Sequence, residues 1–295
     1  MNILANAGRV MKFLALAAGV PAALMLASTA SFAAMGHPSP GEMGMQGAAT
    51  PIAEAIHNFY YGYLTPIIFI ISLFVLALIL VVVYRFNEKA NPTPSRTTHN
   101  AVLEVAWTVV PVMILVIIAI PSFRLLTDQL TLPAADVTVK VTGKQWYWTY
   151  DYPPDQGGGF EFDSYLKPAD QLKPGEFRQL AVDNEAVVPV GKIVRVQVTS
   201  TDVIHSFTVP SFGIRIDAVP GRLNETWFKA EREGVYYGQC SKLCGKDHAF
   251  MPIAFRVVSE AQYAAWLAEA KKKFASSDVG PVRFAANAAA AEPQR

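Results

Sequence analysis

Two long apolar segments near the start of the chain constrain its fold more than any other feature. Each holds close to 20 residues, and neither contains an Asp, Glu, Lys or Arg before Arg124. A helix of about 20 apolar residues spans the hydrocarbon core of a bilayer. A pair of buried core helices is the alternative, which the length and the missing polar faces disfavour. We predict a transmembrane hairpin over residues 57–128, with helices at about 64–84 and 104–126.

The composition agrees with a chain that is partly buried in lipid. Charged residues make up 17% of it, whereas soluble domains carry about 25%. The formal net charge is only +1. Binding of nucleic acid would need a basic surplus, so we expect membrane lipid and no nucleic acid among the partners.

The distribution of basic residues predicts the orientation in the membrane. The loop between the two apolar segments carries Arg85, Lys89 and Arg96, whereas residues 34–84 contain no Lys or Arg. The positive-inside rule places this loop in the cytoplasm. Everything after about Thr127 is then expected outside, which in a bacterial inner membrane is the periplasm.

The first residues of the chain have the pattern of an export signal. Arg9 and Lys12 precede a short apolar run, and small residues follow it. This pattern predicts a signal peptide over residues 1–34, with a retained third membrane anchor as the alternative. Residues 35–56 are rich in Gly, Pro, Ala and Met, which predicts a flexible lead.

After residue 128 the sequence changes to short runs of β-branched and aromatic residues between Gly/Pro turns. Such texture over residues 129–258 predicts an all-β Greek-key sandwich or barrel. A helix is expected over 259–275 and a disordered tail over 276–295. The predicted strands are Val137–Thr142, Gln145–Tyr152, Ile193–Thr199, Ile204–Val209, Ile214–Val219, Leu223–Phe228, Gly234–Gln239 and Ile253–Val258.

The strongest chemical signal is a loop of soft metal ligands near the end of this domain. The loop reads Cys240-Ser-Lys-Leu-Cys244-Gly-Lys-Asp-His248-Ala-Phe-Met251, and His205 lies 35 residues upstream of it. Thiolate, imidazole and thioether donors together favour copper. One Cys, two His and a Met would satisfy a single copper, so a second cysteine indicates a thiolate bridge to a second copper ion.

Three other uses of these residues compete with a copper pair. A Cys240–Cys244 disulfide is chemically possible in the periplasm, but it leaves both histidines and Met251 without a role. A zinc site with two Cys and two His leaves Met251 spare. A single copper site would leave Cys240 as a spectator.

The chain as a whole resembles subunit 2 of cytochrome c oxidase over roughly residues 57–270. The resemblance implies a cupredoxin-like domain with a dinuclear copper (CuA) centre. It assigns the copper ligands to His205, Cys240, Cys244, His248, Met251 and the backbone carbonyl of Lys242. The runs that carry the resemblance are Gly143-Lys-Gln-Trp146-Tyr-Trp148-Thr-Tyr150, Asp202-Val-Ile-His205, Asp217-Ala-Val-Pro-Gly-Arg222 and the copper loop, in family order.

Lys242 departs from the family pattern. The family usually has a Glu at this position, whose side chain reaches a Mg or Mn ion at the contact with subunit 1. An ammonium group cannot ligate a divalent cation and repels it. We therefore expect the copper site to persist and the Mg or Mn ion not to be retained.

The resemblance also implies roles for residues outside the copper loop. It makes Trp146 the point where electrons arrive from cytochrome c, whereas Tyr147 and Tyr150 are expected to pack in strands. Glu104 matches the family position at the entrance of a proton path, with a favourable carboxylate at a helix N-terminus as the alternative. Acidic residues suit docking of a basic cytochrome c: Asp151, Asp155, Glu161, Asp163 and Asp202.

The implied function is that of the subunit through which electrons enter a proton-translocating oxidase. The chain would accept electrons from cytochrome c and pass them to the haem–copper site of subunit 1, with further oxidase subunits as partners. It cannot reduce oxygen alone, because a haem–copper site needs more imidazoles than remain among its five histidines once His205 and His248 bind copper. Alternatives are a copper domain of another reductase, a membrane-anchored copper-binding assembly or storage protein, and a quinol-oxidase subunit 2, which lacks the copper ligands.

Overall fold

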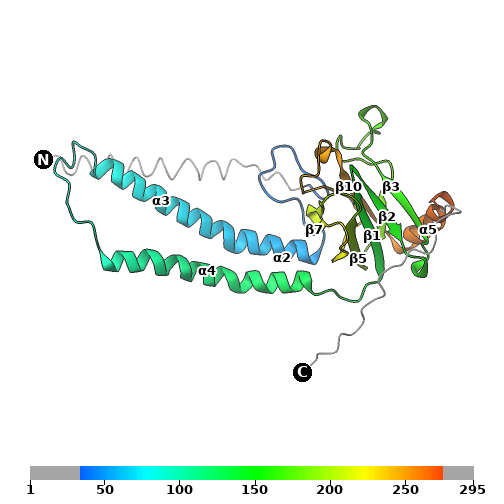
Figure 1. The fold of residues 1–295 in the computed structure, drawn as a ribbon, viewed down its shortest axis with the longest axis horizontal. Coiled ribbons are helices and arrows are strands. Elements are labelled where there is room, and N and C mark those ends of the chain that lie inside the picture. Colours follow the sequence, from blue (N-terminus) through cyan, green and yellow to red (C-terminus); the bar gives the residue numbers. More distant parts are fainter. Residues whose placement is uncertain (1–33, 275–295) are drawn as a thin grey trace, which may run out of the picture.

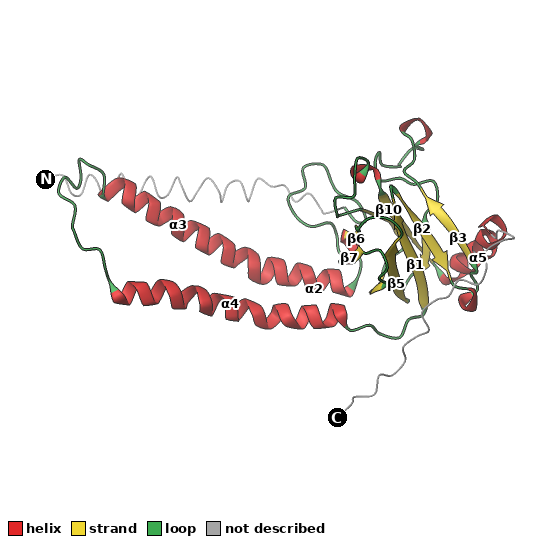
Figure 2. Cartoon of the chain, in the orientation of Figure 1, coloured by secondary structure: helices red, strands yellow, loops and turns green. Residues whose placement is uncertain are grey.

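The computed structural model of the chain describes residues 34–274 as a long helical hairpin joined to a β domain (Figure 1). The predicted signal peptide, apart from Ala34, and the predicted tail at 276–295 lie outside these residues. The hairpin and the β domain lie end to end, so the loop between the two long helices is far from the sheets (Figure 2).

The first arm of the hairpin is one continuous helix. It consists of α2 (Pro51–Phe59), the π-helical turn η1 (Tyr60–Leu64) and α3 (Thr65–Arg85), and α4 (Ala101–Leu130) forms the second arm. Both arms are long and apolar enough to cross a membrane. Their side chains lie almost wholly on the surface of this chain, as expected for helices that face lipid or partner subunits. The first arm begins well before the predicted residue 64.

Residues 34–50 lead into α2 along the surface of the β domain. Ala49 is 2% exposed. Thr50 caps α2 and donates its hydroxyl to the carbonyl of Phe212 over 2.8 Å. This arrangement differs from the flexible lead expected for residues 35–56, because contacts with distant parts of the chain hold the segment in place.

Ten strands in the described part of the chain form the β domain. The larger sheet has the order β3-β2-β1-β5-β8, a second sheet has the order β4-β10-β9, and β6 pairs with β7. The β1–β5 and β4–β10 pairs are parallel and the others are antiparallel. The bounds are β1 Val137–Lys144, β2 Tyr147–Tyr152, β3 Phe160–Ser164, β4 Ala186–Pro189, β5 Ile193–Ser200, β6 His205–Val209, β7 Ile214–Ala218, β8 Asn224–Lys229, β9 Gly234–Gln239 and β10 Pro252–Val258.

Aromatic side chains from the two larger sheets pack against one another to form the core. The ring centroid of Phe255 in β10 lies 5.9 Å from that of Tyr150 in β2 and 5.5 Å from that of Phe228 in β8. All three rings are fully buried. Burial of such rings contributes strongly to domain stability, and edge-to-face pairs of this kind add to it. The predicted all-β sandwich behind a two-helix hairpin is confirmed.

Two strands and one helix complete the domain. All eight predicted strands are present, whereas β3 and β4 were not predicted. Helix α5 (Glu260–Phe274) agrees with the helix expected over 259–275 and packs its Tyr263 and Ala270 against the domain. Trp266 of α5 contacts the ring of Tyr152 at 5.0 Å between centroids.

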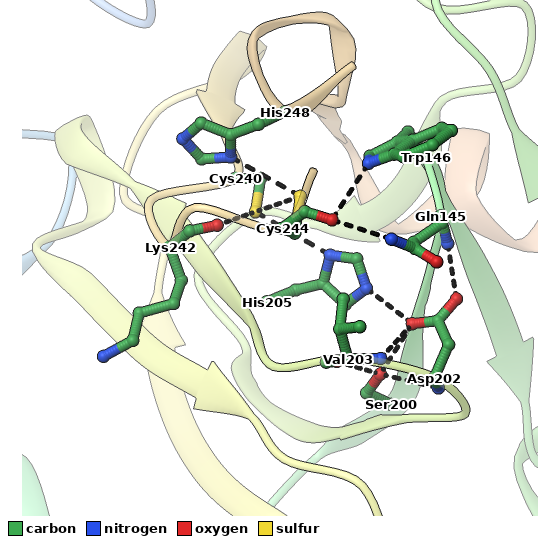
Figure 3. Close-up of polar contacts among 10 residues, drawn as sticks. All are labelled: Gln145, Trp146, Ser200, Asp202, Val203, His205, Cys240, Lys242, Cys244 and His248. Carbon is green, nitrogen blue, oxygen red and sulfur yellow. Dashed lines mark hydrogen bonds and ion pairs between the residues drawn. The ribbon is translucent and has the colours of Figure 1, made fainter. Parts of the chain in front are cut away.

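The sheet topology brings three connections to one end of the β domain. Strands β1 and β5 run parallel, with Gly143 opposite Ser200, so both strands end at the same edge. The β1–β2 turn with Trp146 and the segment that leads into His205 therefore meet there. The loop between β9 and β10 closes over them (Figure 3).

Candidate metal centre

The loop between β9 and β10 is closed at its base by backbone hydrogen bonds. Gln239 pairs with Pro252 across the two strands, and the N–H of Cys240 donates to the carbonyl of Met251 over 3.0 Å. The N–H of Ser241 donates to the carbonyl of Ser206, again over 3.0 Å. These bonds fix the loop relative to β6, the strand that begins with the distant ligand His205.

The four strong donor groups lie close together, and each sulfur faces its own imidazole (Figure 3). The Sγ atoms of Cys240 and Cys244 are 3.8 Å apart and not bonded. Nδ1 of His205 is 3.9 Å from Sγ of Cys240, and Nδ1 of His248 is 3.5 Å from Sγ of Cys244. The ligand atoms of His205, Cys240 and Cys244 lie within 4.8 Å of one another, a group that does not include His248.

Two weaker donors flank this core. The carbonyl oxygen of Lys242 is 3.3 Å from Sγ of Cys240. Met251 is 1% exposed and follows the short helix η5 (His248–Phe250). The side chain of Lys242 points away from the sulfurs, and its Nζ lies 3.7 Å from a carboxylate oxygen of Asp217 (Figure 3). Lys242 can therefore offer its carbonyl while its charge stays outside the centre.

The two thiols differ in how easily they ionise. Burial opposes ionisation of Cys240, but hydrogen bonding to His205 and to the loop backbone outweighs burial and lowers its pKa. Burial and the neighbouring Cys240 thiolate both raise the pKa of Cys244. The second proton of this pair is therefore hard to remove unless a cation takes its place. A bound metal ion would do so, because metal ligation requires thiolates.

Asp202 contacts the His205 ring on the side opposite to Cys240. Its Oδ1 is 2.8 Å from Nε2 of His205, and its Oδ2 accepts a 2.7 Å hydrogen bond from the N–H of Gln145. Burial raises the pKa of Asp202, but the bonds from His205 and from the N–H groups of Val203 and Gln145 lower it overall. We expected Asp202 only as a docking acid, and its contact with His205 is an addition from the structure.

Trp146 lies in the β1–β2 turn, half-buried beneath the copper loop. Its Nε1–H donates to the carbonyl of Cys244 over 3.2 Å, and the side-chain amide of Gln145 donates to the same oxygen over 2.8 Å. Nζ of Lys246 lies 5.7 Å from the centre of the Trp146 ring. The indole is thus in direct contact with the backbone of a predicted copper ligand.

The structure separates the other predicted docking acids. Asp151 does not fit a docking role: it is 4% exposed, lies 3.9 Å from Nζ of Lys140, and burial raises its pKa to about 6. Asp155 is exposed but follows the end of β2 opposite to the turn with Trp146, roughly 17 Å away at about 3.3 Å per residue. Glu161 is exposed on β3 and Asp163 is half-exposed nearer the turn.

Glu104 takes part in the N-terminal cap of α4. Asn100 accepts a hydrogen bond from the N–H of Leu103 over 3.1 Å, and Oε1 of Glu104 accepts one from the N–H of Asn100 over 3.1 Å. This reciprocal pair stabilises the start of the helix, which was the alternative role for Glu104. The proton-path role stays a prediction.

Comparison with known proteins identifies the family. The profile of the cytochrome c oxidase subunit II periplasmic domain matches residues 137–258, and that of its transmembrane domain matches residues 38–125. The chain belongs to the cytochrome c oxidase subunit 2 family. Cytochrome c oxidase subunit 2 of Cereibacter sphaeroides is 49% identical over 274 residues, covering 85% of this chain and 89% of that protein.

Two further proteins are similar to this chain. Probable cytochrome c oxidase subunit 2 of Rickettsia bellii is 48% identical over 248 residues, with 84% of this chain and 91% of that protein covered. The crystal structure of the periplasmic domain of subunit II from Bradyrhizobium japonicum has 62% sequence identity, covers 49% of this chain and all of that chain (100%), and has a TM-score of 0.46.

Family membership confirms the predicted identity and architecture. This subunit 2 is anchored by two transmembrane helices and carries its β domain outside the cytoplasm, as part of a haem–copper oxidase. The family implies a dinuclear copper centre, and the donors fit one. Two thiols, two imidazoles and a thioether form the set of donors that copper prefers, and a backbone carbonyl lies beside them.

Proposed function

We propose that this chain receives electrons from cytochrome c at a dinuclear copper centre and delivers them to the haem–copper site of subunit 1, where oxygen is reduced with proton pumping. The β domain would face the periplasm of a bacterium, with the anchors in the inner membrane. One observation carries the proposal: two unbonded thiols lie 3.8 Å apart, and each has its own imidazole.

The geometry supports two metal positions better than one. A tetrahedral zinc ion binds sulfur at about 2.3 Å and nitrogen at about 2.0–2.1 Å, so its four ligand atoms lie within about 4 Å of one another. His248 does not belong to the cluster of His205 and the two sulfurs, even with a limit of 4.8 Å. Each imidazole lies instead beside a different sulfur, which suits two ions that share both thiolates.

The proposed ligands are those assigned by the family pattern: His205, Cys240, Cys244, His248, Met251 and the carbonyl of Lys242. When bound, the copper pair supplies one-electron redox chemistry. The chain's own residues hold the donors in place and exclude water. His205 is fully buried, Cys240 is 6% exposed and Cys244 is 5% exposed. Such a rigid and dry site lowers the reorganisation that accompanies a change of charge.

Metal analysis of the full-length chain, purified in detergent and loaded with copper, tests the proposal. We expect two copper ions per chain and an EPR hyperfine pattern from one electron shared by two equivalent copper nuclei. One ion per chain, or a bond between the two sulfurs, would refute the dinuclear centre.

The same analysis on the assembled oxidase tests Lys242. We expect no stoichiometric Mg or Mn there, because the ammonium group repels a divalent cation.

For the encounter with cytochrome c we propose the face that contains Trp146, with Asp163 and Asp202 as its nearest acidic groups and Glu161 farther along β3, opposite Asp151. Opposite charges on two partners raise the association rate by about 10–1000-fold, and salt screens this gain. Raising the ionic strength should therefore lower kcat/KM for soluble cytochrome c at least about tenfold. Asp163→Asn should flatten this response most and Glu161→Gln less, whereas Asp155→Asn, beyond the other end of β2, should leave it unchanged. A response to salt that is flat in the unaltered oxidase contradicts the docking proposal.

A further inference from the structure

Asp202 links two parts of the site that come from different loops of the β domain. One part is His205 at the start of β6, and the other is the β1–β2 turn with Gln145 and Trp146. The carboxylate lies between them (Figure 3). Its side chain is 29% exposed, so it is neither a fully buried group nor a free surface charge.

Both oxygens of the Asp202 carboxylate act as hydrogen-bond acceptors. Oδ1 accepts from Nε2 of His205 at 2.8 Å and from the N–H of Val203 at 2.6 Å, and the hydroxyl of Ser200 is 3.2 Å away. Oδ2 accepts from the N–H of Gln145 at 2.7 Å. An asparagine has one acceptor oxygen and one donor nitrogen, so it cannot serve both sides.

Close packing and the hydrogen bond to Asp202 together hold the His205 ring in place. A Cβ atom on Gly143 would lie 2.9 Å from Cδ2 of His205, so the ring packs against bare backbone. The Trp148 ring lies edge-on, with centroids 5.9 Å apart. When Nε2–H donates to Asp202, Nδ1 is left without a proton and points towards Cys240. A carboxylate behind a ligating histidine fixes its tautomer and makes it a stronger ligand.

We propose that Asp202 is a positioning residue of the copper centre: it fixes the tautomer and orientation of His205 and joins the Gln145–Trp146 turn to that ligand. The inference rests on the proposed copper function. It assigns Asp202 a task that a docking charge would not have. One carboxylate then holds in register the tryptophan that meets the electron donor and the histidine that meets the metal.

The test compares Asp202→Asn with Asp155→Asn in the purified, copper-loaded oxidase. Both variants remove one negative charge, but Asp155 lies at the far end of β2. Loss of a carboxylate partner behind a metal ligand lowers metal affinity about 10–100-fold. Asp202→Asn should therefore lose copper to a competing chelator at a roughly 10–100-fold lower chelator concentration. Its His205 nitrogen couplings should change in the EPR-based spectra, and its copper reduction potential should rise because a nearby negative charge is lost. Asp155→Asn should match the unaltered oxidase in all three.

Three outcomes separate the possibilities. If Asp202→Asn keeps the copper affinity, nitrogen couplings and potential of the unaltered oxidase, Asp202 is at most a docking charge and the inference is wrong. If the unaltered oxidase itself lacks a paired-copper signal, the proposed function fails first. If Asp202→Asn does not assemble, as judged by haem content, Ser200→Ala decides. This substitution removes the hydroxyl that holds the Asp202 turn, which lies 3.2 Å from Oδ1 and donates to the carbonyl of Val203 over 2.6 Å. It should change the same nitrogen couplings in the same direction, and unchanged couplings overturn the inference.

Discussion

Replacing Cys240 with serine will abolish the paired-copper signal and lower electron uptake from cytochrome c by more than about 100-fold. Loss of a group behind a metal ligand already costs about 10–100-fold, and a bridging ligand should cost more. Serine offers a hard hydroxyl that stays protonated near neutral pH, so it cannot take the place of a thiolate between two soft ions. Copper analysis, EPR and stopped-flow oxidation of reduced cytochrome c measure the effect in the assembled oxidase. Cys244→Ser should behave in the same way, since the two sulfurs are 3.8 Å apart.

Ser241→Ala is the matched control for this experiment. Ser241 lies in the same loop, and its hydroxyl donates only to the carbonyl of Gln239, over 3.3 Å. Its backbone N–H, which ties the loop to Ser206, is retained. The control should keep both copper ions and the wild-type rate. If Cys240→Ser instead bound one copper ion and accepted electrons at the wild-type rate, Cys240 would be a spectator beside a single copper.

Those parts of the fold that follow from local sequence were predictable. A long apolar run predicts the α4 helix. β-Branched and aromatic residues on both sides of the cysteine loop predict β9 and β10. Strand β4 has only four residues, and its parallel partner β10 lies about 70 positions later, at Phe255 opposite Ala186. Pairing of that kind depends on the whole sheet, so no local pattern indicates it. Strand β3 likewise follows three consecutive glycines and forms only beside β2.

The lead into the first helix shows a different limit of sequence interpretation. Gly, Pro and Ala in residues 35–50 indicate flexibility because they bury little surface by themselves. The structure fixes this segment through its backbone: the carbonyl of Gly36 accepts a 2.7 Å bond from the N–H of Tyr237, and the carbonyl of Ala49 accepts a 2.9 Å bond from the N–H of Glu231. Backbone bonds to distant residues leave no mark on composition.

In the metal site, too, the residues that are close in sequence were predictable and the contacts between distant residues were not. Five of the six proposed ligands share one short loop, so their spacing is visible in the sequence, and His205 stands out as one of five histidines. The role of Asp202 depends on a turn more than 50 residues away, at Gln145. Its position three residues before His205 was a usable signal, because a carboxylate close to a ligating histidine often supports it. The burial of Asp151 between Lys140 and Glu161 emerges only from the strand register.

Trp146→Ala should lower kcat/KM for cytochrome c at least about 30-fold and leave the copper centre intact. A central tryptophan in a protein interface typically costs about 2 kcal/mol or more when truncated, which corresponds to roughly 30-fold in affinity. The substitution also removes the bond from Nε1 to the carbonyl of Cys244, a short connection between the surface and a ligand. Steady-state kinetics over a range of cytochrome c concentrations measure the first effect. Copper EPR and the rate of electron transfer onward to haem should be unchanged.

Tyr147→Ala is the control, because it removes the neighbouring ring of the same hairpin. The Tyr147 ring stacks on Tyr165, with centroids 4.4 Å apart, and takes no part in the bonds to Cys244. Its loss should change kcat/KM by less than about threefold, as for a peripheral contact of less than 1 kcal/mol. If Trp146→Ala matched this control at every cytochrome c concentration, electrons would reach the copper pair by another route. A loss of the EPR signal in Trp146→Ala would instead assign the tryptophan to the support of the copper loop.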